Sequence, residues 1–125
     1  MARELRQRGA AVTAPWDLSP HHARALRVVA RHGQVRPGRI AAHLRVAPRS
    51  VTDVIDALEQ RGLVERAPDP ADRRATVVTL TASGRRLVHR IDEARREDAH
   101  TFFSHLSERD QASLRRILTT LDAID

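Results

Sequence analysis

The clearest hydrophobic pattern in the chain lies between residues 48 and 61. Apolar side chains recur there at i, i+3, i+4 and i+7, as Val51, Val54, Ile55 and Leu58. This spacing places them on one stripe of a helix, and Gly62 follows where a glycine commonly ends one. We predict an amphipathic helix whose N-terminal outer face carries short or forked polar side chains that can reach base edges.

A shorter apolar pattern precedes this helix at residues 37–44. Pro37 suits the first turn of a helix, and Ile40, Ala41 and Leu44 fall on its inner side. Only residues 45–47 separate the two predicted helices, which is the length of the elbow in a helix-turn-helix.

A hairpin is predicted after the second helix. Val64 and the set Thr76, Val78 and Leu80 alternate with their neighbours at the two-residue period of a half-buried strand. The tip between these arms is charged, and a narrow anionic groove would hold its two arginines strongly. The order helix, tight turn, helix, hairpin predicts a winged helix-turn-helix over residues 19–80, in a mainly α fold with a small β-hairpin wing (α+β).

Two further helices are predicted toward the C-terminus. The first runs from a Thr81 cap to about Ser104, and the second starts near Glu108 with Ser107 as its cap. The second carries an apolar face of Leu114, Ile117, Leu118, Leu121 and Ile124. A winged helix of about 70 residues has little spare surface for such faces, so residues 1–18 and 81–125 are predicted to be dimerisation helices. The alternative is that they fold back on their own domain.

Several motifs, in order, are similar to those of the MarR family of bacterial transcriptional regulators. They are Leu18-Ser19-Pro20, residues 24–33, residues 48–52, residues 58–66, the segment Asp69 to Arg74, and Leu80-Thr81-Ala82-Ser83-Gly84-Arg85. The resemblance implies a homodimer that binds a near-palindromic operator, usually represses, and releases DNA when a small ligand binds.

The chain departs from the family pattern in three places. Arg45 stands where a glycine is common, which stores strain if that position needs a positive φ. Ala47 replaces a Ser or Thr N-cap, at a cost of about 1 kcal/mol unless water or DNA phosphate satisfies the helix amides. The long first helix is shortened to about Arg3 to Arg8 before Gly9, Pro15 and Trp16 interrupt it, so its share of a dimer interface is open.

Candidate DNA contacts on the second helix are Pro48, Arg49, Ser50, Thr52 and Asp53. Arg49 is the best candidate for base reading, because a guanidinium can satisfy guanine O6 and N7 together. Ser50 and Thr52 would hold phosphate or cap the helix. Asp53 either accepts from cytosine N4 or, as we favour, orients Arg49 four residues earlier.

Candidate contacts elsewhere are Asp72, Arg73 and Arg74 in the wing and Arg36 and Arg39 before and within the first helix of the motif. We assign Arg74 to the minor groove with Asp72 fixing it, following the Asp-x-Arg pattern of the family, and Arg73 to a phosphate. Asp69 is expected to shape the turn with Pro70. Arg36 and Arg39 are phosphate candidates helped by helix N-terminal amides. The alternative for each arginine alone is a solvated surface charge.

Composition agrees with a nucleic-acid partner. The chain has 125 residues and a formal net charge of +6, and all 22 basic residues are arginine, although coding bias can also produce such usage. It contains no cysteine, which excludes disulfides and thiol sensing. No apolar run is long enough to span a membrane, and the N-terminus is too charged for a signal peptide. A cytoplasmic protein is expected.

The seven histidines do not predict a metal site or a catalytic one. His21 and His22 are adjacent and therefore diverge on a helix, and His100 and His105 are five residues apart rather than four. His32 and His43 are expected on the surface of the DNA-binding domain. No phosphate loop, nucleophile elbow or metalloprotease motif occurs, so we expect no enzyme activity and no cofactor.

A small-molecule effector is expected from the resemblance, in a pocket between the dimer helices and the winged domain. Trp16, Leu18, His21, His22 and Arg24 are the candidates to line it, and they suit an aromatic or acidic compound. Trp16 is favoured as plain core over a ligand platform.

The prediction from sequence is a sequence-specific regulator of double-stranded DNA that acts as a homodimer. The alternative is a winged helix that serves as a protein-interaction module without specific DNA contact. Salt dependence separates the two, because only DNA binding should weaken steeply with salt.

Overall fold

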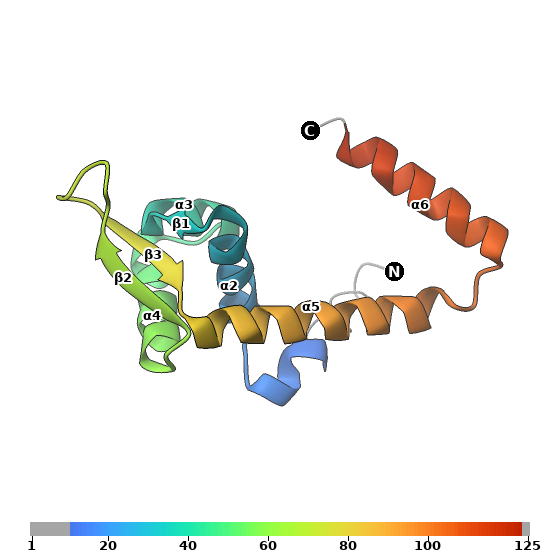
Figure 1. Cartoon of the computed structure of the whole chain (residues 1–125), viewed down its shortest axis with the longest axis horizontal. Coiled ribbons are helices and arrows are strands. Elements are labelled where there is room, and N and C mark those ends of the chain that lie inside the picture. The colour runs from blue at the N-terminus through green and yellow to red at the C-terminus, as the bar shows by residue number, and fades with distance from the viewer. Residues whose placement is uncertain (1–10, 124–125) are drawn as a thin grey trace.

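The computed structural model describes residues 11–123 and has three parts: a winged unit, a long helix and a terminal helix (Figure 1). Residues 11–13 are helical. The elements that follow are η1 (Ala14–Trp16), α2 (Pro20–His32), β1 (Gln34–Val35), α3 (Pro37–Leu44), α4 (Pro48–Gln60), β2 (Val64–Pro68), β3 (Thr76–Leu80), α5 (Ala82–Phe103) and α6 (Glu108–Asp122). The mainly α fold with a β wing is confirmed. The helix expected at Arg3 to Arg8 lies outside the described residues.

Side-chain caps fix where three of the helices begin. Ser19 Oγ accepts the His22 N–H at 3.2 Å, Thr81 Oγ1 accepts the Gly84 N–H at 3.0 Å, and Ser107 Oγ accepts the Asp110 N–H at 3.1 Å. The predicted caps of α5 and α6 are therefore confirmed, each satisfying an amide that has no partner within its own helix.

The elbow between α3 and α4 turns at Arg45, which has φ 56° and ψ 46°. A side chain in this left-handed region costs about 1–2 kcal/mol, so the strain expected from the missing glycine is present. At its other end α4 stops where expected. Gly62 takes φ 72°, and its N–H donates to Glu59 O at 2.9 Å.

The sheet has three antiparallel strands in the order β1-β3-β2, with β3 in the centre. The hairpin pairs Val64 with Leu80 and Pro68 with Thr76. The two-residue strand β1, which pairs Val35 with Val78, was not predicted, because two residues are too few to show a strand period.

One predicted inward residue of the hairpin is wrong. Val78 and Leu80 are buried as expected, but Thr76 is exposed and Val77 is buried instead. Thr76 lies at the wing end of β3, beyond the strand's pairing with β1 at Val78 and Thr79. Neighbouring residues of a strand point to opposite faces of the sheet. Because Val77 and Val78 are both buried, both faces of β3 are covered there, and the predicted alternation of buried and exposed residues does not hold.

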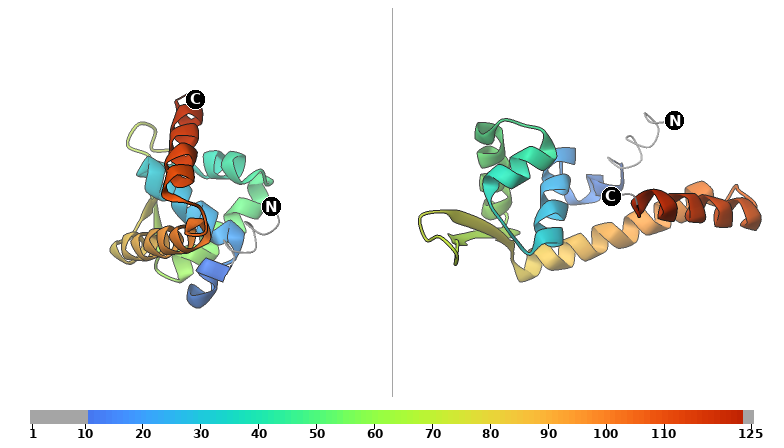
Figure 2. Two further views of the ribbon diagram at one scale, coloured as in Figure 1. Left: turned by 90° about the vertical axis from the view of Figure 1, so that its right-hand side faces the viewer. Right: turned by 90° about the horizontal axis from the view of Figure 1, so that it is seen from above.

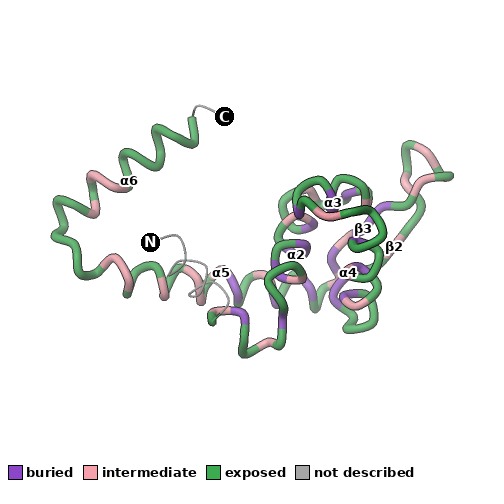
Figure 3. The backbone as a smooth tube through the Cα atoms, turned by 180° about the vertical axis from the view of Figure 1, so that it is seen from behind, coloured by how far each residue is buried: buried purple, intermediate pink, exposed green. Residues whose placement is uncertain are grey.

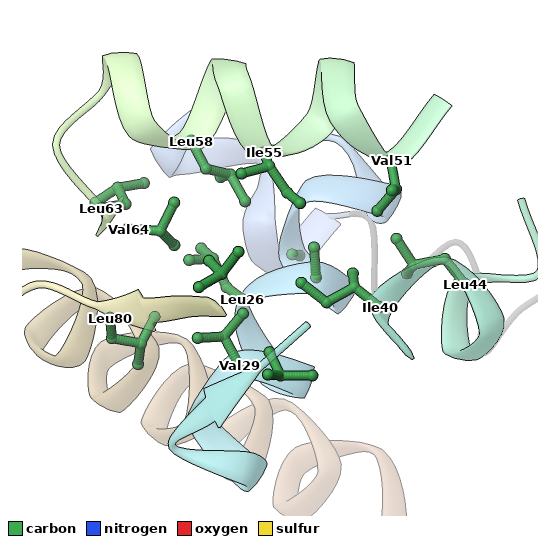
Figure 4. Close-up of a cluster of buried hydrophobic side chains, with 14 of the residues drawn as sticks. Leu26, Val29, Ile40, Leu44, Val51, Ile55, Leu58, Leu63, Val64 and Leu80 are labelled. Carbon is green, nitrogen blue, oxygen red and sulfur yellow. The ribbon is translucent and has the colours of Figure 1, made fainter. Parts of the chain in front are cut away.

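A single hydrophobic core joins α2, α3, α4, the sheet and the first half of α5 (Figure 4). Leu26, Ile40, Ile55 and Leu58 are among its largest fully buried side chains. The stripe predicted for α4 therefore packs inward, and its polar face is left outside. Burial is concentrated in the winged unit and the start of α5 (Figure 3).

Helix α5 leads away from this core. Its 22 residues span about 33 Å, and only Gly84, Leu87 and Ile91 are buried. Its second half and α6 project from the winged unit (Figures 1 and 2). No residue of α6 is buried, and Ile117, Leu118 and Leu121 are 51%, 50% and 56% exposed. The apolar face predicted for α6 is thus present and uncovered in the single chain. Ile124 lies outside the described residues.

Candidate nucleic-acid interface

The N-terminal turn of α4 presents polar groups to solvent. Pro48, Arg49, Ser50, Thr52 and Asp53 are all exposed, while Val51 between them is 1% exposed. Ala47 makes no side-chain cap, Pro48 has no amide hydrogen, and the Ser50 N–H donates to Ala47 O at 3.0 Å. The Arg49 N–H is therefore the amide of this first turn that a phosphate or water can satisfy. The core contacts of α4 hold this face outward, as a base-reading helix requires.

Thr52 makes a local contact within the helix, and Asp53 makes no ion pair with Arg49 among the described residues. Thr52 Oγ1 donates to Pro48 O at 3.3 Å, so this hydroxyl serves the helix's own first carbonyl. Within the described part of the chain, no ion pair joins Asp53 to Arg49. The orienting role of Asp53 therefore stays a prediction.

The wing tip holds Arg74 through Asp72. The Asp72 carboxylate accepts the Arg74 backbone N–H at 3.1 Å and its Nε–H at 3.4 Å. The Arg74 side chain is 93% exposed. The predicted pairing with Asp72 is confirmed, and the rest of the Arg74 guanidinium is left in solvent. Arg73 beside it is also exposed.

Asp69 organises the base of the wing. Its Oδ1 accepts the Ala71 N–H at 2.9 Å, which confirms the turn-shaping role. Its Oδ2 accepts Arg36 Nε–H at 2.8 Å and lies 2.7 Å from Arg36 Nη2. The Ala71 amide first, and then Arg36, hold the pKa of Asp69 below its usual value.

The Arg36–Asp69 contact changes the picture of Arg36. The sequence predicted a phosphate contact, and the structure ties this side chain to the wing, 33 residues away. Its side chain stays 53% exposed, so part of the guanidinium remains accessible beside the ion pair. Arg39, one turn into α3, is exposed and remains a phosphate candidate.

Arg66 links the wing to α4, and sequence reasoning missed it. From β2 its Nη2 lies 2.6 Å from Asp56 Oδ1 and its Nη1 lies 2.8 Å from Glu59 Oε1. Its backbone N–H also donates to Glu59 Oε2 at 3.2 Å. Exposed pairs of this kind contribute little stability each, but two on one guanidinium fix the angle between wing and helix. The sequence signals this link only by the presence of Glu59 and Asp56, seven and ten residues before Arg66.

The five residues expected to line an effector pocket have different surroundings, and Leu18 is buried in the core. Arg24 lines a hollow of about 250 Å³ with Arg27, Val28, Arg31, His43 and Leu44. Trp16 packs against the core, as favoured, and its carbonyl accepts Arg61 Nη2–H at 2.7 Å. The pKa of His22 lies below its usual value because of burial, then Arg61 and His21. His21 is exposed.

A cavity of about 680 Å³ lies elsewhere, between the end of α2, the sheet and the start of α5. Glu65, Arg85, His89 and Asp92 supply its charged groups. The effector pocket expected around Trp16 therefore remains a prediction.

Two kinds of feature are absent from residues 11–123: clusters of metal-ligating side chains and membrane-spanning helices. Within that range no group of three or more His, Cys, Asp or Glu side chains is placed to hold a metal ion. No helix there is long and apolar enough to cross a membrane.

Comparison with known proteins identifies similar chains. A model of the MarR family matches residues 16–75. An uncharacterized HTH-type transcriptional regulator of Mycobacterium bovis, Mb0904, is 39% identical over 97 residues, which cover 78% of this chain. The chain spans only 65% of the length of that relative.

Solved structures share the fold over almost the whole chain. RV1404 from Mycobacterium tuberculosis superposes with a TM-score of 0.86 at 26% identity, covering 98% of this chain and 85% of that one. A mutant of S. aureus MepR, solved bound to an oligodeoxyribonucleotide, gives a TM-score of 0.74 at 25% identity, covering 99% and 92%.

Proposed function

The chain belongs to the MarR family, and we propose that it is a transcriptional regulator that binds double-stranded DNA sequence-specifically as a homodimer. The observation that carries the proposal is the pairing of two exposed elements on one rigid unit. The polar N-terminal turn of α4 and the arginine tip of the wing are held together by Arg66 and by the Arg36–Asp69 contact.

The proposed contacts divide into base reading and backbone positioning. Arg49 reads a guanine edge in the major groove, where a bidentate contact is worth about 1–3 kcal/mol against a wrong base. Arg74 enters the minor groove, with Arg73 and Arg39 on nearby phosphates. The DNA-bound form of the MepR mutant, which has a similar fold, supports this use of the fold.

The proposed homodimer uses the uncovered faces of α5 and α6. A hollow of about 550 Å³ between these helices is lined by apolar groups that include Ala99, Phe103, Leu114 and Leu118. Exposed apolar faces of this kind need a partner in water, and a second copy is the economical one. Two α4 helices related by a two-fold axis then enter successive major grooves about 34 Å apart.

Repression and release by a small aromatic or acidic effector complete the proposal. They rest on family membership, and so does a cytoplasmic location where chromosomal DNA is accessible. The effector would act by changing the angle between the winged unit and α5, because that angle sets the spacing of the two α4 helices.

The proposal is tested by binding to the DNA upstream of the chain's own gene. We expect a footprint at low ionic strength and an affinity that falls linearly on a log-log plot against salt. Arg49→Ala should flatten discrimination between the footprinted sequence and a scrambled one by about 10- to 100-fold. Arg74→Ala should weaken binding to both.

Arg109→Ala is the matched control, since Arg109 is an exposed arginine at the start of α6, outside the winged unit. It should leave discrimination unchanged. No footprint at low ionic strength, or no preference for any sequence after selection from a random pool, would instead favour a protein-interaction module.

A further inference from the structure

Two histidines that sequence analysis left on the surface meet between α2 and α3. His32 lies in the last turn of α2, and His43 lies in the last turn of α3. Their Nε2 atoms are 3.4 Å apart and their ring centres are 5.3 Å apart. His32 is half-buried and His43 is exposed.

The contact is poor as a hydrogen bond. Hydrogen bonds from nitrogen span about 2.7–3.2 Å, so a separation of 3.4 Å gains little energy. The two rings are also tilted by 42°, so they do not stack. A hydrogen bond at this separation also requires one ring to donate and the other to accept.

The two distances are compatible with a chelate. The ring centres are farther apart than the nitrogens, so the two nitrogens face each other across a short gap. An ion bound to both nitrogens at the usual Zn–N distance of about 2.0–2.1 Å would fit this separation.

We propose that His32 and His43 form a two-histidine site for a divalent transition-metal ion of the zinc type. The ion bridges the C-terminal turns of α2 and α3, the two helices that precede α4. Imidazole suits Zn²⁺, Ni²⁺ and Co²⁺, while Mg²⁺ and Ca²⁺ prefer oxygen ligands and would not compete. Water fills the remaining positions.

Arg39 and Arg31 lie close enough to His32 to act on it electrostatically. Their positive charges oppose a bound cation, so we expect the site to be weak. The inference does not depend on DNA binding.

Titration of tag-free, chelator-treated full chain with ZnCl2, followed by calorimetry, tests the proposal. One ion should bind per chain, and His43→Ala and His32→Asn should each lower the affinity at least tenfold, since even the outer-shell partners of metal ligands change it by about 10- to 100-fold. His105→Ala is the matched control, because it removes an exposed histidine outside the pair. It should retain wild-type affinity.

Two further readouts separate a built site from loose surface binding. Co²⁺ should give the strong visible absorption of a tetrahedral complex in wild type and lose it in His43→Ala. Zn²⁺ should raise the melting temperature of wild type but not of either pair variant, because a bound ligand stabilises only the fold that holds it. Equal loss of affinity in His105→Ala and His43→Ala, or no binding up to millimolar Zn²⁺, would overturn the proposal.

Discussion

Gly84 in the first turn of α5 is the position where one added methyl group should do the most damage. A Cβ built there would lie 2.0 Å from the Leu63 carbonyl oxygen and 3.3 Å from Leu80 Cδ2. The oxygen belongs to the backbone and cannot rotate away. It also accepts the Thr81 N–H at 3.1 Å, so α5 and the chain after α4 are locked together at this point.

The cost of Gly84→Ala follows from what must move. The carbonyl or α5 has to shift by about 1 Å to restore contact distance, and overpacking of this kind costs about 1–3 kcal/mol. The shift also weakens the Thr81 N–H bond and the Thr81 cap on Gly84, each worth about 1 kcal/mol. We expect a loss of about 3–5 kcal/mol in the free energy of unfolding, or about 10–20 °C in melting temperature for a chain of this size.

Gly38 in α3 supplies the matched control. It is also a helical glycine, but a Cβ there meets nothing within 4 Å. Gly38→Ala should therefore be neutral or stabilising by up to about 1 kcal/mol, because alanine loses less entropy on folding. Both variants are compared with wild type by urea unfolding and thermal melting at equal protein concentration. A loss of about 3 kcal/mol should shift the melting temperature by much more than about 2 °C. A Gly84→Ala variant that melted within about 2 °C of Gly38→Ala would refute the reasoning.

Two other predictions follow from named contacts. Asp69→Asn should free the wing from Arg36 and weaken DNA binding, with Glu65→Gln, an exposed acid of β2, as control. Because the pKa of Asp69 is lowered in the folded chain, its contribution to stability is present above the usual carboxyl pKa of about 3.9 and is lost as pH falls through the lowered value. The melting temperature of Asp69→Asn should therefore fall less than that of wild type as the pH is lowered through this range. An equal fall in both proteins would contradict this. Leu118→Asp should weaken self-association about a hundredfold or more, since each copy loses about 1.5–3 kcal/mol of burial. Sedimentation of the two variants Leu118→Asp and Thr120→Asp checks this prediction. Thr120→Asp is the control, because it places the same charge on the same helix. Equal weakening of self-association in both variants would count against the α6 interface.

Local patterns were sufficient for the helices and their ends. The stripe of Val51, Ile55 and Leu58 predicted α4 because helix period depends only on neighbours three and four residues away. The Thr81 and Ser107 caps and the glycine turn at Gly62 are local for the same reason. The strain at Arg45 was also expected, because the resemblance to the MarR family places a glycine at that position.

The contacts that build the site were decided by the tertiary structure. Arg36 meets Asp69 across 33 residues, and Arg66 meets Asp56 and Glu59 from a different element. His32 and His43 converge only because α2 and α3 end side by side. The exclusion of a side chain at Gly84 likewise depends on a carbonyl 21 residues earlier in the chain, at Leu63. No helical or strand periodicity in the sequence connects such pairs, so the packing of the helices on the sheet decides which residues meet. The sequence alone determines which elements exist and which of their faces are apolar.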